Sequence, residues 1–199
     1  EIIGKAMFKP EEVIFAPTGR CNLRCSHCRV RRGPEELSVQ AAIEFLDGCS
    51  RAGIERVGFS GGEPFLALDF IAELAKAAVE RGLYFDRLMT NGDWWRDEAE
   101  LRAALGLVYD AGFDGILGLS FDSYHGQSPE RLSAFLKAYF ELWGRKDGAE
   151  ILSVRSSDDT AFLGDLDSLA RALGGAVERR DDGEPFRIAD DAYLSRSEE

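Results

Sequence analysis

The chain has 199 residues, of which 45% are hydrophobic and 30% charged, a composition that favours a folded globular protein over a disordered one. Its length is below the roughly 250 residues of a complete eight-fold βα barrel. A net charge of −12 repels phosphate backbones and argues against a nucleic-acid partner. Neither a membrane span nor a signal peptide is recognisable, so we expect one cytoplasmic domain over residues 1–199.

Short apolar runs alternate along the chain with amphipathic stretches of helical period, which predicts repeated strand–helix units. The helices have readable starts: Ser38 is a candidate N-cap, Asp69 is expected to open the second helix, and Ser128 precedes Pro129 at the start of another. Each predicted helix ends at a glycine: Gly53, Gly82, Gly112, Gly144 and Gly174. The predicted strands are Glu12–Ala16, Arg56–Phe59, Phe85–Met89, Gly115–Leu119 and Ile151–Val154.

Near-continuous apolar strands joined by crossover helices predict an α/β fold with a parallel sheet covered by helices. The arrangement is either an open sheet or a partial TIM-like barrel, (β/α)6 if a sixth strand forms. Residues Phe186–Tyr193 are the candidate sixth strand, weakened by Asp190 and Asp191. The acidic tail from about residue 181 to 199 reads as a lid, a tether or a solvated end.

Three of the four cysteines, Cys21, Cys25 and Cys28, fall within one loop that follows the first strand, in the region 18–32. Clustered thiolates favour zinc or an iron–sulfur cluster, and three ligands leave one coordination position open. Cys49 continues the apolar stripe of the first helix, so we expect it to be buried. His27, between two of the ligands, is poorly placed to share their metal, but a zinc module using it remains an alternative.

The Cys-x3-Cys-x2-Cys loop, with His27 before the last cysteine, resembles the signature of radical S-adenosylmethionine enzymes. Gly61-Gly62-Glu63-Pro64 at the end of the second strand is similar to the GGEP motif of that superfamily. The resemblance implies that Cys21, Cys25 and Cys28 bind three irons of a 4Fe–4S cluster, whose fourth iron chelates S-adenosylmethionine. The reduced cluster then cleaves S-adenosylmethionine to a radical that abstracts hydrogen from the substrate.

The same resemblance assigns the contacts to S-adenosylmethionine. The backbone at Gly61 and Gly62 would approach its amino group closely, and Glu63 would add negative charge beside that group. Residues after the third and fourth strands would contact the nucleoside. The candidate cofactor-binding residues are Gly61, Gly62, Glu63, Pro64, Asn91, Ser120, Asp122, Ser153 and Arg155.

Several of these residues have a second interpretation from their own chemistry. Ser120 and Asp122 are two apart on a strand and share a face, where they either bind hydroxyls or cap the strand end. Ser153 and Arg155 also share a face, and the guanidinium suits a carboxylate ligand or an ion pair with a neighbouring strand. Tyr124 and His125 lie near the expected mouth of the site, as candidate catalytic residues or as ordinary loop packing.

The substrate stays open between a peptide or protein and a small metabolite. No cysteine follows Cys49, so we expect no auxiliary-cluster extension. Because the first strand begins near residue 12, we also expect no leader-binding domain before it. Arg29, Arg31 and Arg32 form a basic group in an acidic chain. They are either solvated or a docking site for an acidic electron donor such as a flavodoxin or ferredoxin.

Overall fold

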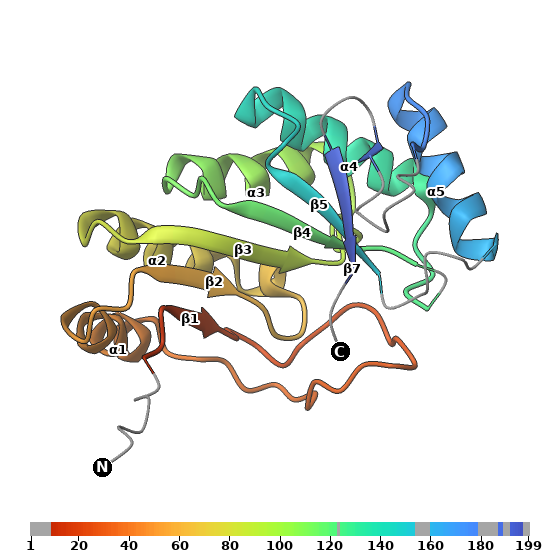
Figure 1. Ribbon diagram of the computed structural model, residues 1–199. Coiled ribbons are helices and arrows are strands. Elements are labelled where there is room, and N and C mark those ends of the chain that lie inside the picture. The colour runs from red at the N-terminus through yellow and green to blue at the C-terminus, as the bar shows by residue number, and fades with distance from the viewer. Residues whose placement is uncertain (1–8, 123, 154–159, 179–186, 189–191, 197–199) are drawn as a thin grey trace, which may run out of the picture.

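The computed structural model describes residues 9–122, 124–153, 160–178, 187–188 and 192–196, and it builds them around one seven-stranded sheet (Figure 1). The strands are β1 (Glu12–Phe15), β2 (Arg56–Phe59), β3 (Tyr84–Thr90), β4 (Ile116–Ser120), β5 (Ala149–Ser153), β6 (Arg187–Ile188) and β7 (Ala192–Arg196). The helices are α1 (Val39–Arg51), α2 (Leu68–Glu80), α3 (Glu98–Asp110), α4 (Pro129–Trp143) and α5 (Thr160–Leu173), with a short 3-10 helix, η1, at Pro64–Ala67.

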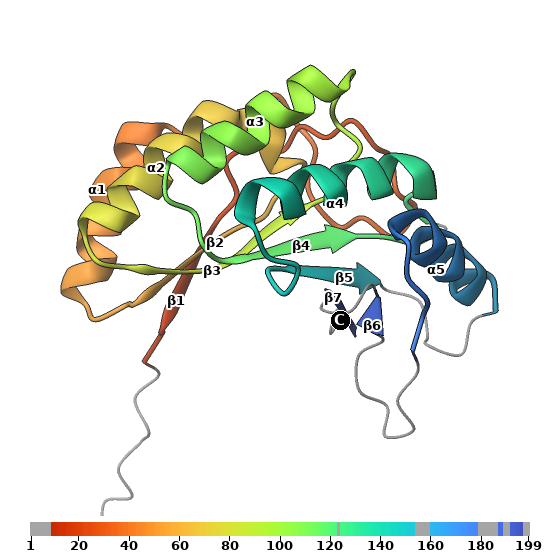
Figure 2. The ribbon, with the colours of Figure 1, turned by 90° about the horizontal axis from the view of Figure 1, so that it is seen from above.

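The sheet has the order β1-β2-β3-β4-β5-β7-β6, and every neighbouring pair is parallel except β6 and β7. Helices α1 to α5 all lie on one side of this sheet, as Figure 2 shows from above. Helices on one face are what successive crossovers of the same hand produce. The prediction of a parallel α/β sheet arranged as a partial TIM-like barrel is therefore confirmed.

The sixth strand differs from the prediction. Instead of one strand over Phe186–Tyr193, the chain forms a short β6 and a separate β7 that pairs with it antiparallel. It is β7, beginning at Ala192, that continues the parallel sheet beside β5. The sequence between the two strands contains Asp190 and Asp191, and aspartate disfavours strands and favours turns.

The predicted helix boundaries hold with one exception. Ser38 and Ser128 are N-caps whose hydroxyls accept hydrogen bonds from the backbone N–H groups of Ala41 and Arg131, at 3.4 and 3.2 Å. Helix α2 begins at Leu68, before the predicted opening at Asp69, because η1 runs directly into it. All five predicted terminal glycines have positive φ: Gly53, Gly82, Gly112, Gly144 and Gly174.

The hydrophobic core lies between the sheet and the helices. Val57 and Phe59 of β2 and Leu117 of β4 are at most 1% exposed, and they pack with buried side chains from α1 to α5. Cys49 belongs to α1 and is 6% exposed, which confirms its expected burial. None of the described helices is long and apolar enough to cross a membrane. Packing in this core sets the positions of the strands, and the strands set the positions of the loops that follow their carboxyl ends.

Candidate functional site

A cavity of about 870 Å³ opens at the carboxyl ends of the strands. Its walls come from the loop after β1, from Gly61 and Gly62 after β2, and from residues at the ends of β3 and β4. In Figure 1 the loop after β1, drawn in orange, runs below the arrowheads of the central strands. The structure therefore brings together four of the five polar clusters that the sequence places at strand ends. The fifth, Arg155–Ser157 after β5, lies outside the described residues.

The thiols of Cys21, Cys25 and Cys28 share this cavity, and all three are free cysteines. Burial raises the pKa of the Cys21 thiol above its usual value. Burial also raises the pKa of Cys25, and the neighbouring thiols of Cys21 and Cys28 raise it further. A metal centre removes this penalty because its positive charge stabilises thiolates. The donor set thus has the chemistry of a thiolate-bound metal centre.

The three thiols can serve a centre that contains several metal atoms. Among the residues that the structure describes, no three histidine, cysteine, aspartate or glutamate side chains are gathered closely enough to hold a single metal ion. In an iron–sulfur cubane each thiolate binds its own iron, so the sulfur atoms need not converge on one point. Three thiols in one cavity are therefore compatible with a cluster in which each sulfur binds a different iron.

Gly61 and Gly62 form a stretch of bare backbone on the cavity wall. Gly61 has φ +118°, a conformation that favours glycine. A Cβ atom on Gly62 would lie 2.0 Å from the carbonyl oxygen of Arg20. The N–H of Gly62 donates to the carbonyl of Thr18 at 2.9 Å, which joins this turn to the cysteine loop. A ligand in the cavity can approach the backbone here without meeting a side chain.

Glu63 and Pro64 follow the two glycines in this turn, and neither is among the described residues that line the cavity. The carboxylate of Glu63 is fully buried and accepts hydrogen bonds from the hydroxyl of Thr90 at 2.8 Å and from the N–H groups of Asn91 and Phe65 at 2.8 and 3.2 Å. Burial raises the pKa of Glu63 to about 7, although these hydrogen bonds oppose the shift. Its carboxylate thus clamps the β2 turn to the end of β3, a role the sequence did not reveal.

Asn91, at the end of β3, lines the cavity and connects three loops. Its side-chain amide donates to Oδ1 of Asn22 at 2.9 Å and to Sγ of Cys21 at 3.8 Å. Its carbonyl accepts a hydrogen bond from Nε2 of Gln127 at 2.7 Å. Asn91 therefore joins the cysteine loop to the segment that follows β4.

The residues after β4 divide between the cavity and the protein interior. Ser120 lines the cavity, as its position at the end of β4 predicts. Asp122 lies beyond the strand, is 1% exposed and is not among the lining residues. Its Oδ2 accepts a hydrogen bond from the buried hydroxyl of Ser153 at 3.1 Å. Asp122 and Ser153 are therefore hydrogen-bonded to each other, and of the pair Ser120 and Asp122 it is Ser120 that lines the cavity.

Beside the cysteines, two histidines and a tyrosine form an aromatic wall, which we define as His27, Tyr124 and His125. The ring centroid of His27 lies 4.7 Å from that of His125 and 5.6 Å from that of Tyr124. Nδ1 of His125 lies 2.8 Å from Oδ1 of Asp122. Burial lowers the pKa of His27, and the neighbouring His125 lowers it further. Asp122 thus orients a cavity histidine from outside the cavity.

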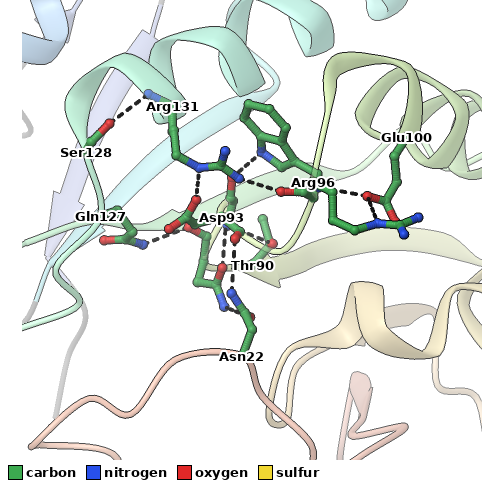
Figure 3. Close-up of polar contacts among 11 residues, drawn as sticks. Asn22, Thr90, Asp93, Arg96, Glu100, Gln127, Ser128 and Arg131 are labelled. Atoms are coloured by element: carbon green, nitrogen blue, oxygen red, sulfur yellow. Dashed lines mark hydrogen bonds and ion pairs between the residues drawn. The ribbon is translucent and has the colours of Figure 1, made fainter.

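Several supporting residues were not identified from the sequence. Figure 3 shows Asn22 reaching from the cysteine loop towards the end of β3, with Asp93 and Arg131 joined close by. The guanidinium of Arg131 pairs with the carboxylate of Asp93 and lies 3.8 Å from the ring centroid of Trp95. Gln127 is buried and bridges the carbonyls of Asn91 and Ser120. The sequence signal for these supporting residues was that they are polar and adjacent to motif residues. Many ordinary loop residues have the same property, so this signal did not identify them.

The fold and this cavity define a radical enzyme core, and comparison with known families gives the same answer. Residues 15–127, more than half of the chain, match the model of the Radical SAM superfamily. The chain belongs to the Radical SAM superfamily. Its cofactors are accordingly a 4Fe–4S cluster and S-adenosylmethionine, and the three cavity thiols and the bare Gly61–Gly62 backbone fit them.

Individual relatives share the core and differ in what they act on. The chain is 30% identical over 130 residues to PqqA peptide cyclase of Rhodopseudomonas palustris, covering 63% of this chain and 32% of the relative. It is 38% identical over 81 residues to GTP 3′,8-cyclase of Geobacter sulfurreducens, covering 38% of this chain and 25% of the relative. The chain thus spans about a third or less of these two curated relatives.

A solved structure supports the fold. Streptococcus suis SuiB bound to its precursor peptide SuiA superposes with a TM-score of 0.64 at 20% identity, covering 82% of this chain and 37% of SuiB. SuiB has also been solved bound to S-adenosylmethionine, with a TM-score of 0.61. At this identity the likeness is one of fold.

Proposed function

We propose that this chain is a radical enzyme that cleaves S-adenosylmethionine reductively and abstracts a hydrogen atom from a peptide or protein. The observation that carries the proposal is that the three thiols and the bare Gly61–Gly62 backbone line one cavity of about 870 Å³. When bound, the cluster supplies the electron that releases a 5′-deoxyadenosyl radical from S-adenosylmethionine. The roles of the chain itself are to bind, to orient and to exclude water.

In this proposal Cys21, Cys25 and Cys28 hold the cluster, and Gly61 and Gly62 offer backbone groups to the amino end of S-adenosylmethionine. Glu63 and Pro64 support this contact indirectly, because their side chains shape the turn behind it. Ser120 and Asn91, which also line the cavity, are proposed to border the space for the nucleoside. Arg155 stays a candidate for a carboxylate partner on sequence grounds alone.

His125 is the proposed proton-transfer group for the substrate, and Tyr124 flanks it at the mouth. A carboxylate at 2.8 Å favours the tautomer in which Nδ1–H donates to Asp122. The other ring nitrogen, Nε2, is then free to accept a proton in the cavity. The hydrogen bond from Ser153 to Asp122 holds this carboxylate in place. Asp122 and Ser153 are thus proposed positioning residues.

A peptide substrate is favoured by two similarities. PqqA peptide cyclase is the relative whose alignment covers 63% of this chain, and the SuiB fold is seen with a precursor peptide. The described helices α1 to α5 lie on one face of the sheet (Figure 2), and a large substrate is proposed to reach the cavity from the other face. The alternative is a small molecule, favoured by the higher identity, over a shorter segment, to GTP 3′,8-cyclase.

The proposal extends to the setting in which the enzyme works. Four free cysteines and a thiolate-bound cluster suit a reducing compartment, so we propose a cytoplasmic location. Arg29 and Arg32 are exposed at the cavity rim in a chain of net charge −12. They are proposed to meet an acidic electron donor such as a flavodoxin or ferredoxin. We further propose that residues 1–199 act as one domain.

The test is anaerobic reconstitution with iron and sulfide, followed by reduction and incubation with S-adenosylmethionine. We expect close to four irons per chain and formation of 5′-deoxyadenosine, measured by mass spectrometry. Cys25→Ala should lose both cluster and product. Cys49→Ala is the matched control because Cys49 is buried in α1, outside the cavity lining, and this variant should retain both.

Two results would contradict the proposal. Stoichiometric zinc with no cleavage of S-adenosylmethionine would support a zinc-binding module instead. Cleavage with no deuterium transfer from labelled peptides, but with transfer from a labelled nucleotide, would retain the radical chemistry and overturn the peptide substrate. Short peptides encoded beside the gene are the first substrates to label.

A further inference from the structure

Both the backbone and the side chain of Asn91 are hydrogen-bonded within the site. Its backbone N–H donates to Glu63, and its carbonyl accepts from Gln127. Its side-chain Oδ1 accepts a hydrogen bond from the N–H of Asp93 at 2.8 Å. Both partners of the backbone are buried, so the residue is fixed from two sides. The side chain of Asn91 is therefore held in one orientation.

This orientation aims the amide nitrogen at the cysteine loop. Because Oδ1 is occupied by Asp93, the amide cannot flip without losing that hydrogen bond. Nδ2 then has two acceptors, Oδ1 of Asn22 at 2.9 Å and Sγ of Cys21 at 3.8 Å. The first holds the loop beside Cys21, and the second places an N–H dipole on the sulfur itself. A distance of 3.8 Å suits a hydrogen bond to the large sulfur atom.

We propose that Asn91 is a positioning residue that donates a hydrogen bond to the Cys21 thiolate and thereby raises the reduction potential of the cluster. The inference rests on the proposed function in that Cys21 is taken as a cluster ligand. Reduction adds one negative charge to the centre, and an N–H dipole directed at a ligand sulfur stabilises the more negative state. Its partner Asn22 aligns the loop without donating to the sulfur.

The test compares the midpoint potential of the reconstituted cluster in wild type, Asn91→Ala and Asn22→Ala, by redox titration followed by electron paramagnetic resonance. Asn91→Ala should shift the potential to a more negative value because the donor is lost. Asn22→Ala loosens the loop but leaves the donor to Cys21 in place, so its potential should shift clearly less than that of Asn91→Ala. Equal potentials in wild type and Asn91→Ala would overturn the inference, as would equal shifts in both variants.

A second readout does not require the Asn91→Ala variant to load a cluster. The chain has two asparagines, Asn22 and Asn91, so labelling asparagine side chains with 15N introduces two labels. In Asn22→Ala the one remaining label is that of Asn91, and pulsed paramagnetic resonance of the reduced cluster should detect its coupling. Absence of this coupling from a loaded cluster contradicts the inference. Failure of wild type to assemble any cluster contradicts the proposed function instead.

Discussion

The carboxylate of Glu63 and the hydroxyl of Thr90 are joined by a buried hydrogen bond of 2.8 Å. It links the turn that follows β2 to the last residue of β3, across 27 positions of sequence. The same carboxylate accepts a hydrogen bond from the N–H of Asn91. One acidic side chain therefore supports both the Gly61–Gly62 backbone and the residue whose amide contacts the cysteine loop. Its protonation state therefore affects the stability of the whole site.

The stability of the protein should fall as the pH rises through the titration of Glu63. Its pKa is raised from 4.5 to about 7 in the folded state, so the fold binds this proton more tightly than the unfolded chain does. The contribution is present below pH 4.5, is lost as the pH rises through about 7, and amounts to about 3 kcal/mol. Urea unfolding of wild type and Glu63→Gln under anaerobic conditions measures it. The glutamine variant cannot titrate and should show a flatter profile, and parallel profiles would contradict the assignment.

Thr90→Val should destabilise the protein by about 1–3 kcal/mol, because it leaves a buried carboxylate short of one donor with almost no change in side-chain shape. The cost should be larger at pH 8 than at pH 5.5, since the lost hydrogen bond stabilises the ionised form. Unfolding midpoints at the two pH values check this. A cost independent of pH would mean that the hydroxyl acts through its contact with the N–H of Gly92 alone.

Gly62→Ala should abolish binding of S-adenosylmethionine and destabilise the protein by about 1–3 kcal/mol, because the added methyl group would overlap the backbone carbonyl of Arg20. The control is Gly106→Ala in α3, where a Cβ atom meets nothing within 4 Å. That substitution should stabilise the helix by about 0.5–1 kcal/mol and leave binding intact. Calorimetric titration and thermal unfolding separate the two effects. Unchanged binding of S-adenosylmethionine by Gly62→Ala would contradict a contact between this ligand and the Gly61–Gly62 backbone.

Asp122→Ala should change the tautomer of His125. The chain has two histidines, so nitrogen-15 spectra of the labelled rings contain two sets of signals. In wild type we expect His125 to carry its proton on Nδ1, and in the variant on Nε2. Loss of a buried carboxylate with several hydrogen bonds should also cost about 3–5 kcal/mol.

Ser153→Ala serves as the control for that experiment. It removes the hydrogen bond to Oδ2 of Asp122 and leaves Oδ1 facing His125, so the tautomer should be that of wild type. Should the Asp122→Ala spectrum match wild type, the carboxylate does not select the tautomer, and His125 loses its proposed role in proton transfer.

The fold was largely predictable because strand and helix patterns are local. The run Arg56–Phe59 was predicted with the bounds that β2 has, and Ser128 was recognised as the cap of α4 from its neighbour Pro129. The clustering of three cysteines was equally accessible, since they lie within eight residues of one loop and line one cavity. These features depend on residues that are close in the sequence.

What could not be predicted depends on contacts between distant segments. Asn22 and Asn91 are separated by 69 positions, and nothing in the spacing of either indicates the other. Glu63 belongs to a motif whose resemblance implied negative charge beside the amino group of S-adenosylmethionine, and nothing in its position indicated the hydrogen bonds to Thr90 and Asn91. Ser120 and Asp122 were predicted to share a face from strand spacing, but β4 ends at Ser120, so strand alternation does not determine the direction of Asp122.

The sheet has two edges, β1 on one side and the short β6 on the other, and among the described strands these edges do not pair with each other. A closed barrel admits a ligand only through its ends, so a polymer would have to enter by a terminus or a tight hairpin. An unclosed barrel can receive the middle of a peptide through the gap between its edge strands. The modified position in a peptide substrate would then be limited by how near its residue can come to the cavity, and not by its distance from either end of the peptide.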